Sequence, residues 1–166
     1  MSIDTEWILR RLESNVPVFQ GLLRDVVEPQ TTWKPSPEKW SLIEVINHLA
    51  DEEIEDFGTR LRLLLEDPLQ EWPPIDPNRA VVERQYAAKH LKESLDRFVH
   101  ARRTSVAWLK GLEQPDWQLG SQLRAGELFA SWLAHDLIHI RQINRLHYEF
   151  LTSCATSFSV AYAGDW

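Results

Sequence analysis

Residues 127–150, ELFASWLAHDLIHIRQINRLHYEF, carry the strongest structural signal in the chain. Apolar residues recur along this stretch at steps of three and four, the period of an α-helix with one buried face. The stretch therefore predicts one long helix, with Arg141, Gln142, Asn144 and Arg145 mostly turned away from the apolar stripe. The apolar positions are Leu128, Phe129, Trp132, Leu133, Leu137, Ile140, Ile143 and Leu146.

His135 and His139 lie at the centre of this predicted helix. Residues four apart lie one above the other, so both imidazoles point to one face, as ligands of a single metal ion would. The pair alone is a weak signal, because many helices carry two histidines at this spacing in the core or on the surface. In metalloproteases a glutamate follows the first histidine as general base. Asp136 holds that place here and reaches less far, so we do not predict a protease.

A first amphipathic helix is predicted from about residue 4 to residue 27. Asp4 is a candidate N-cap, because its side chain can accept a hydrogen bond from the first turn. Pro17 lies inside the pattern. It removes a backbone donor and clashes with the preceding turn, so we expect it to kink or split the helix.

Two more helices are predicted between proline-rich loops. Ser41 and Glu44 match a capping box, which predicts a helix from there to about Glu66. Another helix is predicted from about Ala80 to Lys110, where Gly111 is a natural stop. The apolar face of the second helix is expected to contain Val45, Ile46, Leu49, Ile54, Phe57, Leu61 and Leu64.

Four long helical patterns without a strand pattern indicate an all-α fold, a four-helix bundle. At 166 residues the chain is predicted to form a single domain over residues 1–166. The tail, residues 152–166, has no charge before Asp165. Because it is apolar, we expect it to pack on the bundle or on a second subunit.

The composition excludes several classes of protein. The net charge of −7 and pI near 5.4 argue against nucleic-acid binding, and pairs such as Arg102-Arg103 are too short to form a basic patch. No apolar run approaches the roughly 20 residues of a membrane span, and the N-terminus lacks a signal sequence. The one cysteine, Cys154, permits no internal disulfide. We therefore expect a cytoplasmic protein without nucleic-acid or membrane partners.

A third metal ligand has to come from one of four other histidines. His147 is two turns beyond His139, about 12 Å away by helical rise, so one ion cannot easily take all three. Nothing local favours His90 or His100. His48 has the best context, because it follows a capped helix start and lies between apolar residues on an inward face.

The segments WSLIEVINHLADEE, residues 40–53, and HDLIHIRQI, residues 135–143, resemble the DinB/YfiT-like family of metal-dependent proteins. The resemblance covers nearly the whole chain through Phe150. It implies an up-down-down-up four-helix bundle, often a homodimer, in which His48, His135 and His139 bind one divalent metal. Members of this family include bacillithiol- and mycothiol-dependent S-transferases and isomerases.

Three neutral imidazoles would leave a coordination position open for water or substrate, as in catalytic metal sites. The metal could lower the pKa of a bound water or thiol. We expect nickel or zinc, with iron or manganese as alternatives, and a low-molecular-weight thiol as a candidate cofactor. Asp136 is a candidate catalytic base or orienting group, or else a salt-bridge partner of Arg141 or another basic residue. Glu52 and Glu53 could approach the metal, but acidic residues on a helix of this composition more often form a solvated face.

Two functions are compatible with these features. In the first, a metal-dependent enzyme, an S-transferase or hydrolase, activates a thiol or water against an electrophilic small molecule. In the second, a dimeric metal-binding stress or sensor protein has no turnover. Without the family resemblance, three core histidines satisfied by ordinary hydrogen bonds would be the better explanation of the pattern.

Overall fold

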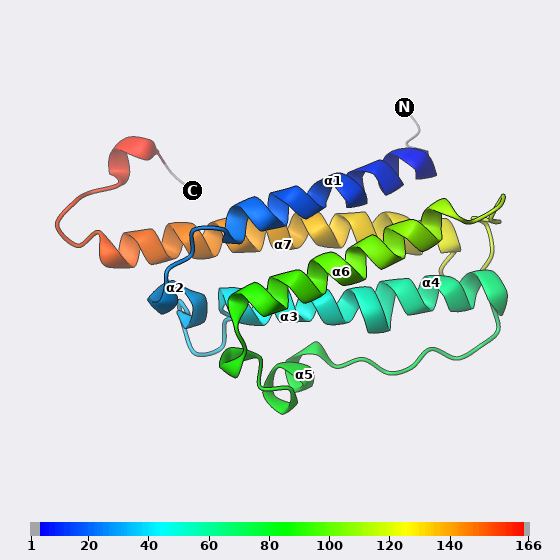
Figure 1. The fold of residues 1–166 in the computed structure, drawn as a ribbon, viewed down its shortest axis with the longest axis horizontal. Coiled ribbons are helices and arrows are strands. Elements are labelled where there is room, and N and C mark those ends of the chain that lie inside the picture. The colour runs from blue at the N-terminus through cyan, green and yellow to red at the C-terminus, as the bar shows by residue number, and fades with distance from the viewer. Residues whose placement is uncertain (1–3, 165–166) are drawn as a thin grey trace.

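Each predicted helix needs a partner for its apolar face. The computed structural model describes residues 4–164, and in it the long helices pack against one another (Figure 1). The described residues contain no strand, so the all-α prediction is confirmed. The long segments are α1 (Thr5–Leu23), α3 (Leu42–Asp51) continuing through the π-helix η1 (Glu52–Asp56) into α4 (Phe57–Glu66), α6 (Leu91–Lys110) and α7 (Ala125–Cys154).

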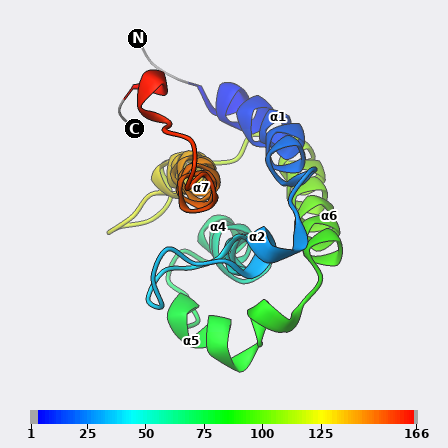
Figure 2. The same cartoon turned by 90° about the vertical axis from the view of Figure 1, so that its left-hand side faces the viewer.

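The helices surround a common axis in the end view (Figure 2). Helices α1 and α7 run in one direction, and α3–α4 and α6 run in the other (Figure 1). The short elements α2 (Glu28–Thr32), α5 (Pro77–Glu83) and η2 (Tyr86–Ala88) lie in the connections, and η3 (Ala161–Ala163) lies in the tail. Within residues 4–164, every helix is too short or too polar to cross a membrane.

The predicted helix starts are confirmed at two caps. The side chain of Asp4 accepts a hydrogen bond from the amide of Trp7 at 2.7 Å. The amide of Ser41 donates to Glu44 at 2.7 Å, which closes the capping box of α3. Pro17 does not split α1, contrary to one of the two expectations. It lies on the exposed face, where water can hydrate the carbonyl group that loses its partner.

The prediction of one helix over residues 80–110 is wrong in its first third. Helix α5 starts earlier, at Pro77, because Asp76 caps it by accepting from the amide of Arg79 at 3.1 Å. The backbone then turns at Gln85, which has a φ of 50°, and α6 begins only at Leu91. The break lets α5 fold across the outside of α3 (Figure 2).

The second long helix contains a π-turn that sequence periodicity did not predict. The amide of Phe57 donates to the carbonyl of Glu52, five residues back rather than four. A Cβ on Gly58 would lie 2.5 Å from the carbonyl oxygen of Glu53, so the turn requires glycine at this position. Ile54, predicted to be buried, is 46% exposed as a result, whereas Glu52 and Glu53 are buried.

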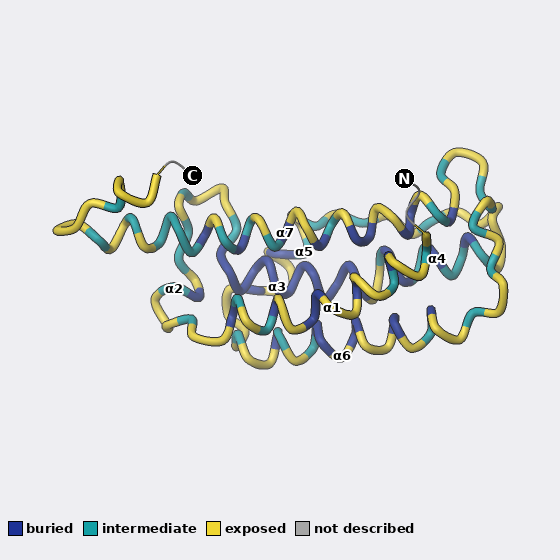
Figure 3. Tube along the Cα trace, turned by 90° about the horizontal axis from the view of Figure 1, so that it is seen from above, coloured by how far each residue is buried: buried dark blue, intermediate teal, exposed yellow. Residues whose placement is uncertain are grey.

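The core has two apolar clusters separated by a layer of polar side chains. Buried residues alternate with exposed ones along each long helix (Figure 3). One cluster joins the end of α1 to α3, and the other joins the start of α1 to α4. Each long helix places polar residues between its two apolar parts. These buried polar residues are Asn15 on α1, His48 on α3, Glu52 and Glu53 on η1, Arg102 on α6, and Asp136 and His139 on α7.

Helix α7 is longer than predicted and leads into an exposed tail. Leu137, expected in the apolar stripe, is 51% exposed, because it faces away from the bundle. In the described tail Phe158 and Tyr162 are exposed, so packing on the chain's own bundle is not observed there. The tail leaves the end of α7 beyond the other helices (Figure 1), and residues 165–166 lie outside the described residues. Packing on a second subunit stays a prediction.

Candidate metal centre

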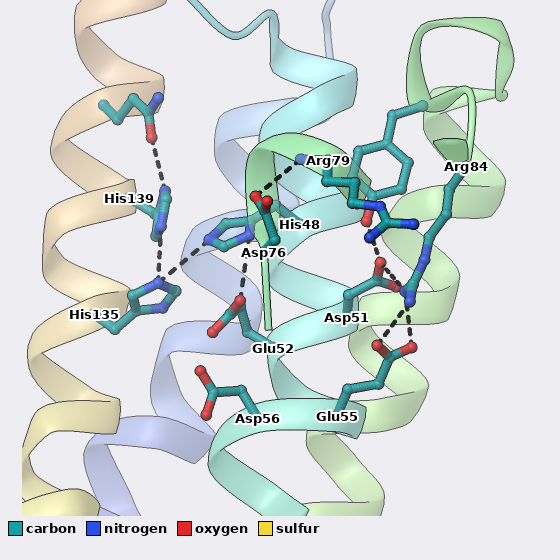
Figure 4. Close-up of polar contacts among 12 residues, drawn as sticks. His48, Asp51, Glu52, Glu55, Asp56, Asp76, Arg79, Arg84, His135 and His139 are labelled. Atoms are coloured by element: carbon teal, nitrogen blue, oxygen red, sulfur yellow. Dashed lines mark hydrogen bonds and ion pairs between the residues drawn. The ribbon is translucent and has the colours of Figure 1, made fainter. Parts of the chain in front are cut away.

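Helices α3 and α7 bring His48, His135 and His139 together in the polar layer (Figure 4). The Nε2 atom of His135 lies 3.0 Å from Nε2 of His139 and 3.4 Å from Nε2 of His48. One ring nitrogen from each residue lies within 4.8 Å of the others. The spacing on α7 and the inward face of α3 therefore produce the cluster that the sequence indicated.

The other histidines lie elsewhere. His147 contacts the carbonyl of Leu22 at 2.8 Å and the side chain of Gln30 at 2.7 Å, so it links α7 to the end of α1 and to α2. His90 is the residue before α6, and His100 is exposed on that helix. Among the described residues, His48 alone joins the α7 pair in a possible metal-binding group.

All three imidazoles are held in the neutral form. Burial, and then the other two histidines, lower the pKa of His48 from 6.5 to about 3. Burial also lowers the pKa of His135 to about 4, and that of His139 below its ordinary value. Metal ligation requires neutral imidazole, so the folded chain supplies these ligands without first removing a proton at neutral pH.

Gln142, predicted to turn away, fixes the proton of His139. Its Oε1 atom lies 2.7 Å from Nδ1 of His139. A carbonyl oxygen can only accept, so Nδ1 carries the proton and Nε2 presents a lone pair to the cluster. The spacing of three residues between them on one helix was the sequence signal for this contact.

Glu52 lies beside Nδ1 of His48, as Gln142 lies beside Nδ1 of His139. Its Oε1 lies 3.5 Å from Nδ1 of His48, on the side of the ring away from the cluster. Both residues are buried, so the interpretation of Glu52 as part of a solvated face is wrong. Burial and the neighbouring Asp56 raise the pKa of Glu52 to about 8. Ring nitrogens of three neutral imidazoles that converge this closely can turn their lone pairs toward a cation between them, so these residues fit a divalent metal ion.

Asp136 points away from the cluster into a buried ion-pair network. Arg102 donates to both of its carboxylate oxygens at 2.7 Å, and Asn15 donates to one of them at 2.8 Å. A salt bridge to a basic residue other than Arg141, one of the two interpretations of Asp136, is thus present. A catalytic role for Asp136 stays a prediction.

Glu53 belongs to the same network. It accepts from Arg102 and from the indole nitrogen of Trp132, each at 2.6 Å. The two neighbouring glutamates of η1 therefore face different surroundings, Glu52 the histidines and Glu53 the guanidinium group. The sequence did not reveal this network, because nothing local pairs Arg102 with residues 34 and 49 positions away.

Helix α5 is attached next to the histidines by a second group of charges (Figure 4). Arg84 donates to both carboxylate oxygens of Glu55 at 2.8 Å and also to Asp51. Asp51 accepts from Tyr86 and Arg97 as well. Burial alone would raise the pKa of Asp51, but these partners outweigh it and lower the pKa. Asp51 and Glu55, on the α5 side of the histidines, are therefore already paired with cations.

The cluster opens into a recess of about 620 Å³. His48, His135 and His139 line it together with Glu52, Trp40 and Gln142. The Trp40 ring centroid lies 4.8 Å from that of His48. A metal ion on the three imidazoles would thus have one side turned toward space that a small molecule can enter.

Comparisons with known proteins agree with this fold. The solved structure of YfiT from Bacillus subtilis, described as "a probable metal-dependent hydrolase with an unusual four-helix bundle topology", superposes with a TM-score of 0.79, 16% identity and 90% of each chain covered. At that identity the likeness shows the fold, and the predicted four-helix bundle is confirmed. No curated protein sequence matches the chain. The sequence profile of the DinB superfamily matches residues 11–143, four-fifths of the chain, and the chain therefore belongs to the DinB superfamily.

Proposed function

We propose that the protein is a metal-dependent enzyme that binds one divalent ion through His48, His135 and His139 and acts on an electrophilic small molecule with water or a low-molecular-weight thiol. The observation that carries the proposal is the convergence of three neutral imidazoles, two of them buried and that of His135 half-buried, at the wall of an open recess. A structural ion would be expected in a closed site with four protein ligands.

The bound ion would act as a Lewis acid and lower the pKa of a water or thiol beside it. The chain's own residues orient the ligand imidazoles and enclose the site. Gln142 holds the tautomer of His139, Glu52 lies against His48, and Trp40 forms an apolar wall. We expect nickel or zinc, with iron or manganese as alternatives, because all four accept imidazole nitrogen. A homodimer in the cytoplasm remains our expectation.

The first test is the metal content of tag-free protein, measured by elemental mass spectrometry. We expect about one divalent ion per chain, and its loss in His48→Ala, His135→Ala and His139→Ala. His90→Ala and His100→Ala are the controls, since neither residue lies in the cluster. Equal metal content in all five variants would exclude the three-histidine site.

A non-catalytic metal-binding protein is the second candidate, and one observation favours it. The ligands come from two helices, so an ion would crosslink α3 to α7 and stabilise the bundle. Chelation distinguishes the two functions. An enzyme loses hydrolysis of p-nitrophenyl acetate, or thiol addition to monochlorobimane, and keeps most of its thermal stability. A structural ion takes much of the stability with it.

A further inference from the structure

The recess at the histidines continues into a larger groove along α7. This groove has a volume of about 670 Å³ and lies between the loop before α3 and the outer face of α7. The recess and the groove share Lys39, Trp40 and Gln142 in their walls. A molecule that reaches the histidines can therefore extend into the groove.

Two exposed cations that form no salt bridge within the described residues distinguish this groove from the other side of the cluster. Lys39 and Arg141 are exposed and form no salt bridge with any residue of the described chain, while Arg145 pairs with Glu149 at 2.7 Å. The carboxylate of Glu38 is the other negative charge nearby, and its own backbone amide, Ser36 and Lys39 lower its pKa. Across the cluster, Asp51 and Glu55 are neutralised by Arg84 and Arg97.

With Glu38 and Glu149 set against Lys39, Arg141 and Arg145, the groove keeps one net positive charge on a chain whose net charge is −7. Arg141 follows His139 by two residues, which is about 3 Å of helical rise, and Arg145 follows by about 9 Å. Measured along the axis of α7, an anionic group beside these side chains would lie within about 10 Å of the level of the metal ligands, on a neighbouring face of the helix. Guanidinium groups bind carboxylate and phosphate through paired hydrogen bonds, and an ammonium group adds a point charge.

Apolar side chains also line the groove. Ile138 is 52% exposed on α7, and Trp40 and Pro35 face it from the loop. An exposed isoleucine beside a partly exposed tryptophan provides apolar surface for a ligand rather than for the chain's own core. The groove thus combines an anion anchor with an apolar wall.

We propose that this groove binds the carboxylate of an organic anion, with Lys39 and Arg141 as the anchor and Trp40 and Ile138 against its apolar body. The assignment of the reacting end to the histidines rests on the proposed function, but the binding of the carboxylate does not. The substrates of the protein are then small organic acids whose reactive group lies several bonds from the carboxylate.

The test compares 4-phenylbutyrate with its neutral amide in NMR titrations of the full chain, with and without zinc. We expect the carboxylate to bind at least about tenfold more tightly than the amide, with shifts at the Trp40 indole and weakening at high salt. The double variant Lys39→Gln/Arg141→Gln should lose this preference. Arg11→Gln/Arg103→Gln is the control, because it removes the same charge from exposed positions on α1 and α6.

Three outcomes would overturn the proposal. These are equal binding of acid and amide, a preference that survives in the Lys39→Gln/Arg141→Gln variant, and tighter binding of phenyl phosphate than of phenylbutyrate. The same titration in His48→Ala separates the two proposals. If the His48→Ala variant binds no metal but still prefers the carboxylate, the groove proposal holds whatever becomes of the metal-dependent function. If the metal-loaded wild type shows no preference, the groove proposal alone is contradicted.

Discussion

Arg102 binds both carboxylate oxygens of Asp136 in a part of the bundle where these side chains are at most 1% exposed. The guanidinium group also neutralises Glu53, so one cation compensates two buried carboxylates. Asp136 precedes one histidine ligand by three residues and follows the other directly. The ion pair therefore fixes the position of α7 at the candidate metal centre.

Replacement of Arg102 by leucine should destabilise the protein by about 3–5 kcal/mol, because two carboxylates would remain buried without a cation. Arg103→Leu is the matched control. That side chain is exposed, so its free energy of unfolding should change by less than about 0.5 kcal/mol. Urea unfolding measures both. A loss below about 1 kcal/mol for Arg102→Leu would show that the network contributes little.

Gln142 should control metal affinity through the tautomer of His139. Gln142→Leu removes the acceptor of the Nδ1 proton, so the affinity should fall about 10- to 100-fold. Gln142→Glu keeps an acceptor at the same place and should retain the affinity. Competition with a chromophoric chelator measures the dissociation constants. Equal losses in the two variants would mean that packing, rather than the hydrogen bond, is responsible.

Gly58→Ala should disturb the π-turn. The added Cβ would lie 2.5 Å from the carbonyl oxygen of Glu53, and relief of this contact should cost about 1–3 kcal/mol of stability. Gly21→Ala is the opposite control. It adds a Cβ with nothing within 4 Å on helix α1, and it should stabilise by about 0.5–1 kcal/mol. Urea unfolding curves of the two variants should therefore move in opposite directions.

The metal-free protein should lose stability as the pH falls below 6.5. Burial holds the pKa of His135 at about 4, whereas an unfolded histidine titrates near 6.5, so the unfolded chain takes up protons first. The contribution is complete above pH 6.5 and is lost as the pH falls toward 4. The change is at most about 1.4 kcal/mol per pH unit for one histidine.

His135→Phe should therefore flatten the dependence of unfolding free energy on pH between 6 and 5. His100→Phe, at an exposed position, should keep the wild-type slope. Glu52 contributes with the opposite sign, because its pKa of about 8 favours the folded state at low pH, but this contribution is common to all three proteins. Parallel slopes for wild type and His135→Phe would contradict a depressed pKa at His135.

Local signals predicted the parts of the site that lie on one helix or beside a cap. The four-residue spacing of His135 and His139 and the capping box before His48 both act over one or two turns. They sufficed to choose His48 from four candidates. The end of α6 at Gly111 was predicted for the same reason.

The parts that depend on distant partners were not predicted. Arg102 and Arg103 look alike in the sequence, and only the position of Arg102 on the face of Phe98 and Val106 could have marked it as buried. Its partners on η1 and α7 could not be identified, because ion pairs between helices follow from packing. The break at Gln85 likewise follows a residue with a distant partner, since Arg84 donates to Glu55 from another helix.

The π-turn at Glu52–Asp56 has a consequence for comparison with related chains. A π-turn is the form that one residue inserted into an α-helix takes, and each such residue rotates the following helix by about 100°. A relative without the insertion would need a one-residue gap between His48 and Phe57 for its side chains to correspond. Grafting of α4 between such relatives would move every side chain after the graft to another face unless the extra residue were carried with it.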